Sequence, residues 1–353
     1  MGRRRYLWLG AACALVLVAG GAAASCSWAA PGYRGPKSAH FDGERFQNLV
    51  PKPDKSFWSV LKWQVTRDPP TWERLENASY PAPPERVHGD GLRITFINHA
   101  SVLIQTSGLN ILTDPIYSER ASPLGWAGPA RVREPGISFS ALPTVDAVLI
   151  SHNHYDHLDL DTLRRLSERD GPLIVAGLGT RAHLEDHGIP GGHDLDWWET
   201  LPLVDEVSVS AVPAQHWSAR FIGDRRNTLW VGFVIEGAGG PIYFAGDTGW
   251  GPHFELIAER FSPFRAALIP IGAYQPRWFM KDNHIAPFEA ADAAFLMKAQ
   301  ASVPIHFGTF PLGDEGQLEA LDDLQDYLSG MVAAPNFVVL DFGEGREFSP
   351  LVP

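Results

Sequence analysis

From residue 92 onward, short apolar runs alternate with stretches in which apolar residues recur every three or four positions. The short runs are rich in β-branched and aromatic residues, which predicts strands within 93–115 and at 145–150, 172–177, 206–214, 229–237, 241–247, 266–272, 302–308 and 337–343. The stretches of longer period predict helices at 159–169, 179–187, 253–261, 286–299 and 316–330. Strands mixed with helices indicate an α/β layered protein, and we expect residues 86–353 to form its main domain.

The segment before this domain, residues 27–85, follows neither period. Its part from 31 to 85 contains nine prolines, which exclude long regular elements. One helix is expected at 55–66, where Phe57, Val60 and Leu61 share a face. The segment is too rich in aromatic residues for a solvated linker. Two interpretations remain: an arm packed on the core, which we favour, or a flap that faces lipid.

Residues 1–26 are predicted to direct export rather than to join the fold. Three arginines at 3–5 precede an almost unbroken apolar run at 6–24 that ends in small residues. The letters RRRYL (3–7) fit a loose twin-arginine pattern, and AASC (23–26) resembles a lipoprotein cleavage box. We therefore expect the cell envelope or periplasm and association with a membrane. Lipid attachment at Cys26, simple cleavage and an uncleaved anchor all stay open.

Composition and charge narrow the function classes. The chain is 45% hydrophobic and 20% charged, as is typical of a globular protein. Its formal net charge of −12 argues against a nucleic-acid partner, because phosphate contacts need clustered Lys and Arg. The two cysteines, Cys13 and Cys26, both lie in the predicted export segment, so the main domain has no disulfide and no thiolate ligand. Nothing in the sequence fixes the oligomeric state.

The stretch SHNHYDHLD (151–159) places ligand-type side chains directly after the predicted strand 145–150. Residues two apart project to one side of an extended segment, so His152 and His154 can share one metal. The chain then turns, which lets Asp156 and His157 face a second metal, while Asp159 is expected to cap the following helix. Neutral imidazoles and a carboxylate suit Zn²⁺, with Mn²⁺ and iron as alternatives.

Further donors occur where other predicted strands end. His216 follows an apolar strand in VPAQHWS, Asp247 lies in FAGDTG, and His306 interrupts the strand VPIHFGTF. Each residue alone has an ordinary structural explanation. Because all three share the order strand, ligand, small residue, we expect them to converge at one end of a sheet sandwich and to complete a site for two divalent ions.

These seven residues resemble the full ligand pattern of the metallo-β-lactamase superfamily, whose fold is an αββα sandwich with two metals at the sheet edges. The stretches DPIYSERASP, LISHNHYDHLDLDTL, IYFAGDTGW, PIGAYQPRWFMKDNHIAP and IHFGTF more closely resemble the N-acylphosphatidylethanolamine-hydrolysing phospholipase D family and its bacterial relatives. The resemblance runs from about residue 40 to 343. It implies one metal on His152, His154 and His216, a second on Asp156, His157 and His306, and Asp247 as the bridge.

The resemblance also implies roles for residues around the metals. His284, in FMKDNHIAP, matches a further active-site histidine of that family, expected to stabilise charge on the oxygens. A hydroxide that bridges the metals would attack phosphorus or carbonyl, oriented by Asp156. His99 and Asp114 would fix the tautomers of ligands, although a structural role is equally open. Arg220, Arg277 and Trp278 are candidates for binding phosphate or an acyl chain.

Three functions remain after these arguments. The favoured one is a phospholipase D-like phosphodiesterase that cleaves N-acylphosphatidylethanolamine-type phospholipids. The second is a lactonase or other ester hydrolase of the same fold, because fold and metal site do not fix the substrate. The third is a non-catalytic binding protein of the envelope, against which the complete set of seven donors argues.

Overall fold

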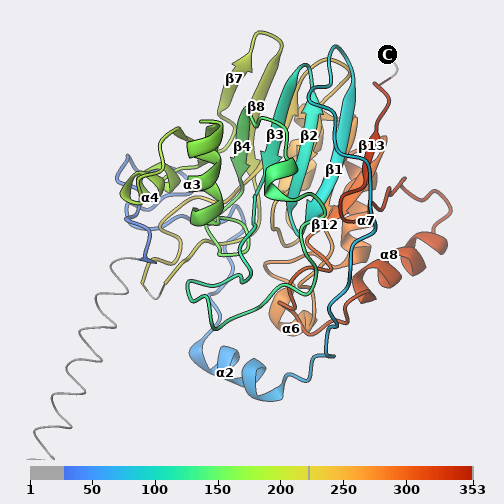
Figure 1. Cartoon of the computed structure of the whole chain (residues 1–353). Coiled ribbons are helices and arrows are strands. Elements are labelled where there is room, and N and C mark those ends of the chain that lie inside the picture. The colour runs from blue at the N-terminus through green and yellow to red at the C-terminus, as the bar shows by residue number, and fades with distance from the viewer. Residues whose placement is uncertain (1–27, 222, 352–353) are drawn as a thin grey trace, which may run out of the picture.

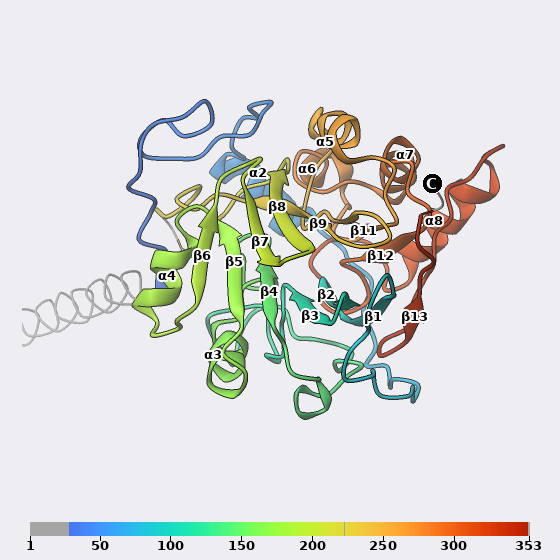
Figure 2. The ribbon, with the colours of Figure 1, turned by 90° about the horizontal axis from the view of Figure 1, so that it is seen from above.

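The computed structural model describes residues 28–221 and 223–351. The predicted export segment 1–26, with Cys26, lies outside the described residues. Two mixed sheets pack face to face, and helices cover their outer faces, as Figures 1 and 2 show. The expected α/β layered αββα sandwich is confirmed.

The first sheet has seven strands in the order β13-β1-β2-β3-β4-β5-β6. The pairs from β13 to β3 are antiparallel, and those from β3 to β6 are parallel. Its strands are β1 (Leu92–Asn98), β2 (Ser101–Thr106), β3 (Leu109–Thr113), β4 (Ala147–Ile150), β5 (Leu173–Gly177), β6 (Gly192–Leu195) and β13 (Gly345–Glu347). Strand β4, buried along its whole length, delivers the chain to the motif loop at 151–159.

The second sheet has six strands in the order β12-β11-β10-β9-β8-β7. The three strands β10, β11 and β12 run parallel to one another, and the pairs from β7 to β10 are antiparallel. Its strands are β7 (Thr200–Val204), β8 (Val207–Pro213), β9 (Val231–Glu236), β10 (Ile242–Phe244), β11 (Ala266–Pro270) and β12 (Ser302–Ile305). The strands β8, β10 and β12 end shortly before His216, Asp247 and His306.

Helices cover both sheets from outside. The helices α3 (Leu160–Arg169) and α4 (Thr180–Asp186) lie on the side of the first sheet, and α5 (His253–Phe261), α7 (Pro287–Leu296) and α8 (Glu319–Ser329) on that of the second (Figure 2). The main core lies between the sheets, where rings such as Phe96, Phe233 and Phe244 are fully buried. A second apolar cluster joins the first sheet to Leu163 and Leu166 of α3.

Two short elements lie near the lower rim in Figure 1: α2 (Phe57–Thr66) and α6 (Arg277–Met280). One 3-10 turn, η1 (Phe139–Ala141), precedes β4. Within residues 28–221 and 223–351, no helix has both the length and the apolar composition that crossing a bilayer requires.

The prediction of a strand at 337–343 is wrong. Phe337 makes only an isolated bridge with Ser302, and the strand β13 begins later, at Gly345. Between them the chain turns at Gly343, whose φ of +89° is open to glycine and strained for other residues. The backbone of Gly343 there lies against that of Gly136, so the segment is held by a close contact rather than by strand pairing.

The arm, described from residue 28 to 85, joins the core in its first part and stays outside it in its second. Phe41 and Phe46 are buried within the main core and contact Tyr33. In α2, by contrast, no residue is buried, and Phe57 is 72% exposed. Packing on the core therefore accounts for the aromatic residues of the first part but not for Phe57 and Trp58 of α2.

Candidate metal centre

The motif loop that follows β4 is held by two buried polar residues. Arg220 donates from Nη1 to the carbonyl oxygens of Asn153 and Leu158, at 2.9 and 2.8 Å, and its guanidinium stacks on Tyr155. Asp159 accepts hydrogen bonds from the backbone N–H groups of Asp161 and Thr162 and so caps α3, as predicted. The loop is thereby fixed at both ends with its imidazoles turned toward the second sheet.

The first cluster of donors joins this loop to the end of β8. His152 Nε2 lies 2.7 Å from His154 Nδ1, which in turn lies 3.3 Å from His216 Nε2. His216 comes from the second sheet and donates from Nδ1 to the carbonyl of Asn283 at 2.9 Å. In the neutral ring, Nε2 of His216 therefore carries a lone pair that points at the other two imidazoles.

The second cluster lies beside the first. His157 Nε2 and His306 Nε2 lie 3.2 and 3.4 Å from Asp156 Oδ2. His306 follows β12, so this cluster also joins the two sheets. The side chains of His157 and His306 are at most 1% exposed, and that of Asp156 is 13% exposed. This difference leaves Asp156 as the member of the cluster that solvent or substrate can reach.

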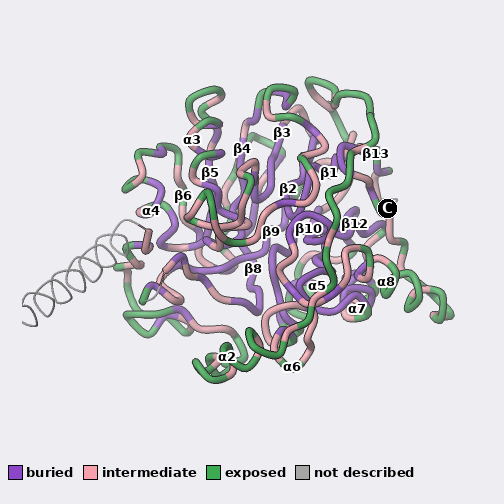
Figure 3. Tube along the Cα trace, turned by 60° about the horizontal axis from the view of Figure 1, so that its bottom comes forward, coloured by how far each residue is buried: buried purple, intermediate pink, exposed green. Residues whose placement is uncertain are grey.

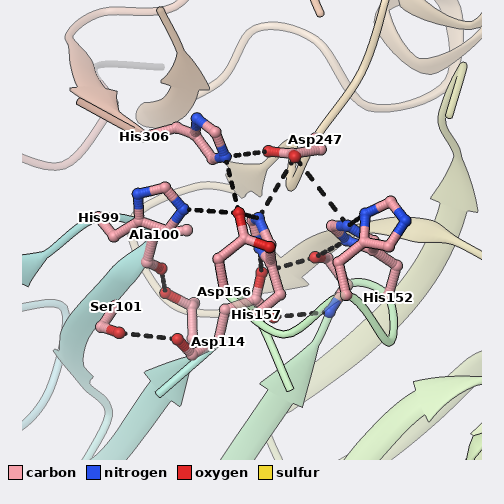
Figure 4. A network of polar contacts seen from close by, with 12 residues as sticks. His99, Ala100, Ser101, Asp114, His152, Asp156, His157, Asp247 and His306 are labelled. Atoms are coloured by element: carbon pink, nitrogen blue, oxygen red, sulfur yellow. Dashed lines mark hydrogen bonds and ion pairs between the residues drawn. The ribbon is translucent and has the colours of Figure 1, made fainter. Parts of the chain in front are cut away.

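Asp247 lies between the two clusters, as Figure 4 shows. Its Oδ1 is 3.2 Å from His306 Nε2, and its Oδ2 is 3.3, 3.7 and 4.0 Å from the Nε2 atoms of His157, His216 and His152. The preceding residue, Gly246, has φ +59° and lies so close to Ser151 that a Cβ would be 2.5 Å from that side chain. A glycine is required here for the Asp247 carboxylate to reach both clusters.

Asp114 orients ligands of both clusters. Its Oδ2 accepts from His157 Nδ1 and from Ser151 Oγ, both at 2.6 Å. Ser151 Oγ then lies 3.0 Å from His152 Nδ1 and can accept its proton. One buried carboxylate thus turns Nε2 of His157 directly, and Nε2 of His152 through Ser151, toward the centre. His99 makes the matching contact to Asp156, with Nε2 3.0 Å from Oδ2.

These contacts test whether the residues fit bound metals. When its Nδ1–H group is hydrogen-bonded to Asp114, a neutral His157 presents the lone pair of Nε2 to two carboxylate oxygens. His152 and His216 likewise present lone pairs to His154. Facing acceptors repel one another unless a proton or a metal cation lies among them, and imidazole nitrogen with carboxylate oxygen is a donor set for divalent metals. The buried His/Asp clusters therefore fit a site for two divalent ions.

The two clusters differ in charge when no metal is bound. Burial lowers the pKa of His154 and of His216 to about 3, so both imidazoles stay neutral, the form that binds metal. Burial also acts to lower the pKa of His306, but the carboxylates of Asp247 and Asp156 outweigh it and raise that pKa to about 9. The second cluster must therefore release a proton when a metal binds.

Strained backbone accompanies the centre. His99, Asp114 and His306 have φ values of +47°, +34° and +63°, in the left-handed region that side chains with a Cβ rarely adopt. His306 N–H donates to the carbonyl of His99 at 2.7 Å, which ties two of these residues together. Gly272 packs so tightly on His306 that a Cβ there would overlap the His306 carbonyl. Such strain persists where the surrounding structure imposes it and is commonest at functional sites.

His284 lies at the open side of the centre. Its Nδ1 is 3.8 Å from Asp247 Oδ2, and its side chain is 15% exposed, against 1% for His216 and His306. Burial lowers its pKa to about 3. This distance places His284 among the residues that could ligate a metal together with Asp247 and His216, so its expected role apart from the metals stays a prediction.

Two of the three predicted substrate contacts have partners within the protein, and their roles toward a substrate stay predictions. Arg220 is 8% exposed and donates to backbone carbonyls of the motif loop, so it supports the loop that carries the ligand candidates. Arg277 donates to the carbonyl of His284 at 2.9 Å and to the carboxylate of Glu289 at 2.7 Å, so it holds the loop of His284. Trp278 is 45% exposed on α6 and stays available for contact with a substrate.

Sequence reasoning missed one residue of the arm that supports the centre. Asn48 donates from Nδ2 to the carbonyl of His216 at 2.8 Å and accepts at Oδ1 from the His216 N–H at 3.0 Å. The same oxygen accepts from Trp230 Nε1 at 2.8 Å. An isolated Asn in a proline-rich stretch carries no sequence signal for such a contact, because its partner is 168 residues away.

Comparison with known proteins adds family relations to this geometry. The family described as "Beta-lactamase superfamily domain" matches residues 109–307. A Caenorhabditis elegans protein named N-acyl-phosphatidylethanolamine-hydrolyzing phospholipase D 1 is 38% identical over 272 residues, which cover 73% of this chain and 76% of the worm protein. An uncharacterised Mycobacterium tuberculosis protein is 40% identical over 238 residues, which cover 65% of this chain and 63% of the mycobacterial protein.

Solved structures share the fold. An isothiocyanate hydrolase from Delia radicum gut bacteria superposes with a TM-score of 0.59 at 21% identity and covers 73% of this chain and 99% of its own. A metallo hydrolase from Ignicoccus hospitalis gives a TM-score of 0.56 at 22% identity over 73% of this chain and 99% of its own. At such identities the likeness concerns the fold alone.

Proposed function

Because this chain belongs to the metallo-β-lactamase superfamily and is a metal-dependent hydrolase of that fold, we propose that it cleaves N-acylphosphatidylethanolamine-type phospholipids as a phospholipase D-like phosphodiesterase. The observation that carries the hydrolytic chemistry is the convergence of two imidazole–carboxylate clusters on Asp247. The substrate class is supported by the 38% identity to a phospholipase of that specificity over 73% of the chain.

The proposal assigns each ion to one cluster. His152, His154 and His216 would hold one ion, Asp156, His157 and His306 the other, and Asp247 would contact both. Bound divalent ions supply Lewis acidity, which lowers the pKa of a coordinated water and offsets the charge of a phosphodiester. The acidic balance of the chain, −12, makes this local positive charge necessary for an anionic substrate.

Residues of the chain complete the reaction. Asp156 is the member of the second cluster that solvent can reach, so it would orient the attacking water by accepting a hydrogen bond from it at a carboxylate oxygen, with Oδ2 held by His99. His284, whose lowered pKa keeps the ring neutral, would donate a hydrogen bond to the departing oxygen from the open side of the centre, and the proton released by the attacking water would end on that oxygen. Water adds to phosphorus, the bond from phosphorus to the N-acylethanolamine oxygen breaks, and phosphatidic acid and N-acylethanolamine leave.

A head-group release assay tests this proposal. The metal-loaded full chain is given N-acylphosphatidylethanolamine, phosphatidylethanolamine, phosphatidylcholine and a simple lactone, and the products are identified by mass spectrometry. We expect phosphatidic acid and N-acylethanolamine from the first lipid. Asp247→Asn is the control, because it should abolish release without removing any lipid-facing residue.

Other products would contradict the proposal. Release of free fatty acid would mean that an acyl ester or amide is cleaved. Preferred opening of the lactone would move the chain to the second of the functions that the sequence leaves open.

A further inference from the structure

The helix α2 turns its apolar side outward. Phe57, Leu61 and Val65 follow one another at intervals of four residues, so they form a stripe along one face, which Trp58 widens. These four side chains are 72%, 40%, 74% and 72% exposed in the order Phe57, Leu61, Val65, Trp58. A surface helix of a globular protein normally buries such a stripe against the core.

The opposite side of α2 fixes this orientation. Trp63 stacks on Phe279 of α6 with ring centroids 4.6 Å apart, and its Nε1 donates to Asp314 at 2.9 Å. Arg67, just after the helix, pairs with the same Asp314 at 3.1 Å and donates to the carbonyl of Gly313. Because this side is the bound one, the apolar stripe is presented to the surroundings, as the exposed trace of α2 beside α6 in Figure 3 shows.

Lysines gather in and next to α2 and α6, although the chain is acidic as a whole. Four of the six lysines in the chain lie in or next to these two short helices, namely Lys52, Lys55, Lys62 and Lys281. Lys55 pairs with Asp282 at 2.6 Å, and Lys62 lies over the ring of the exposed Trp278 at 4.8 Å. The helix itself contains no acidic residue. Exposed apolar and aromatic side chains with lysines at their margin match an anionic lipid surface.

We propose that α2 docks on an anionic lipid bilayer, with its apolar stripe among the head groups and the neighbouring lysines on anionic lipids. A second copy of this chain fits less well, since its α2 would bring the same lysines against these. The proposal goes beyond the proposed function, because it concerns binding and holds whether or not a lipid is cleaved.

Docking through α2 would also place the metal centre at the bilayer. Lys55 and Trp63 attach α2 to Asp282 and Phe279, and Asp282 precedes Asn283 and His284 at the open side of the centre. The carbonyl of Asn283 accepts the Nδ1 proton of the ligand candidate His216. The attachment point of α2 at Asp282 is therefore two residues from His284 in sequence.

Hydrogen–deuterium exchange of the full chain with vesicles tests the docking. We expect amides of 57–66 to exchange more slowly when mixed phosphatidylcholine–phosphatidylglycerol vesicles are added, and less so with phosphatidylcholine alone. This readout reports on α2 itself, whatever residues 1–27 contribute. The inactive Asp247→Asn variant should show the same protection, which separates this proposal from the proposed function.

Matched substitutions provide the control. The double variant Trp58→Ser/Val65→Ser should weaken the vesicle-induced protection, with an apparent dissociation constant raised roughly tenfold or more by the lost apolar burial. Trp126→Ser/Val332→Ser removes a tryptophan and a valine that are 78% and 108% exposed elsewhere, and it should behave like the wild type. Lys52→Glu/Lys62→Glu should weaken protection by the anionic vesicles only.

Three results would overturn the proposal. The first is unchanged exchange of 57–66 in the presence of vesicles, and the second is equal loss of protection in both double variants. The third is a dimer in lipid-free solution, seen by analytical ultracentrifugation, that Trp58→Ser/Val65→Ser converts to a monomer. That last result would assign the stripe to a second copy of the chain.

Discussion

At the scale of single residues, the centre depends on which nitrogen of each imidazole carries its proton. Asp114 accepts a hydrogen bond from His157 directly and orients His152 through Ser151, and the carbonyl of Asn283 accepts a hydrogen bond from His216. Each contact leaves a lone pair pointing inward, so the hydrogen-bond partners determine the metal-binding form of the ligands.

His284 tests whether stabilising the departing oxygen and binding metal are roles of different residues. Its open position beside Asp247 suits a group that donates a hydrogen bond to the negative charge developing on a departing oxygen, a role worth about 10²–10⁴-fold in rate. We expect His284→Ala to keep both metals and the fold but to lose kcat by that factor. Turnover and metal content of the same preparation are measured together. Near-normal turnover would refute the role, and loss of metal would make His284 a ligand.

His253 supplies a test of pH dependence outside the ligand set. It is 1% exposed, with Nε2 3.0 Å from Thr248 Oγ1, and burial lowers its pKa from 6.5 to about 3. A lowered folded-state pKa gives stability that is full above the unfolded value of 6.5 and is lost as pH falls toward 3. The stability advantage of the wild type over His253→Gln should therefore shrink on acidification.

Chemical denaturation at pH about 7.5 and about 5 measures this difference, on either side of the ordinary histidine pKa. Parallel loss of stability in the two proteins would show that His253 takes no part in acid sensitivity. His183, which is also buried and has a pKa lowered to about 3, offers a second position for the same comparison.

The ligand candidates could be predicted from sequence because each has a ligating side chain directly after an apolar run, and the structure brings all seven together. The left-handed backbone at His99, Asp114 and His306 could not be predicted, since nothing in the residue types signals it. The internal contacts of Arg220 and Arg277 could not be predicted for a related reason. An arginine in sequence does not show whether its partners are backbone carbonyls within the same protein.

At the scale of elements, the ligand candidates lie at strand ends, and the arm contacts one of them through Asn48. Most helices and strands could be predicted from the spacing of their apolar residues, because packing against the core imposes that spacing on the sequence. The edge strands β6 and β7 were missed, since GHDL is short and polar and TLPLV contains Pro202, both features that edges tolerate. The arm gave no period at all, so its contact with His216 depends on tertiary structure alone.

Asn48 tests whether the arm is part of the centre. Asn48→Ala would leave the backbone groups of His216 without their partners, at a cost of about 1–3 kcal/mol in unfolding free energy. We also expect metal affinity to fall by about 10–100-fold, as for other residues that orient a ligand. Gln47→Ala is the control, because its side chain contacts only the exposed Asp42. Equal behaviour of the two variants in denaturation and chelator competition would contradict this account.

At the scale of the whole molecule, the metal centre joins the two sheets. The first sheet supplies the loop with His152, His154, Asp156 and His157, and the second supplies His216, Asp247 and His306 at the ends of β8, β10 and β12. Metal bound by residues from both sheets should stabilise the native state by mass action, because the unfolded chain lacks the site. The helix α2 lies beside α6 and the loop that carries His284.

The most direct test of a two-metal hydrolase is the metal-to-chain ratio, measured by mass spectrometry with inductively coupled plasma on protein of known activity. The wild type should carry about two divalent ions per chain, as two-metal hydrolysis requires. His152→Ala and Asp247→Ala should lose metal and activity together while staying folded by circular dichroism. A fully active wild type without metal, or a full complement of metal in both variants, would contradict the account.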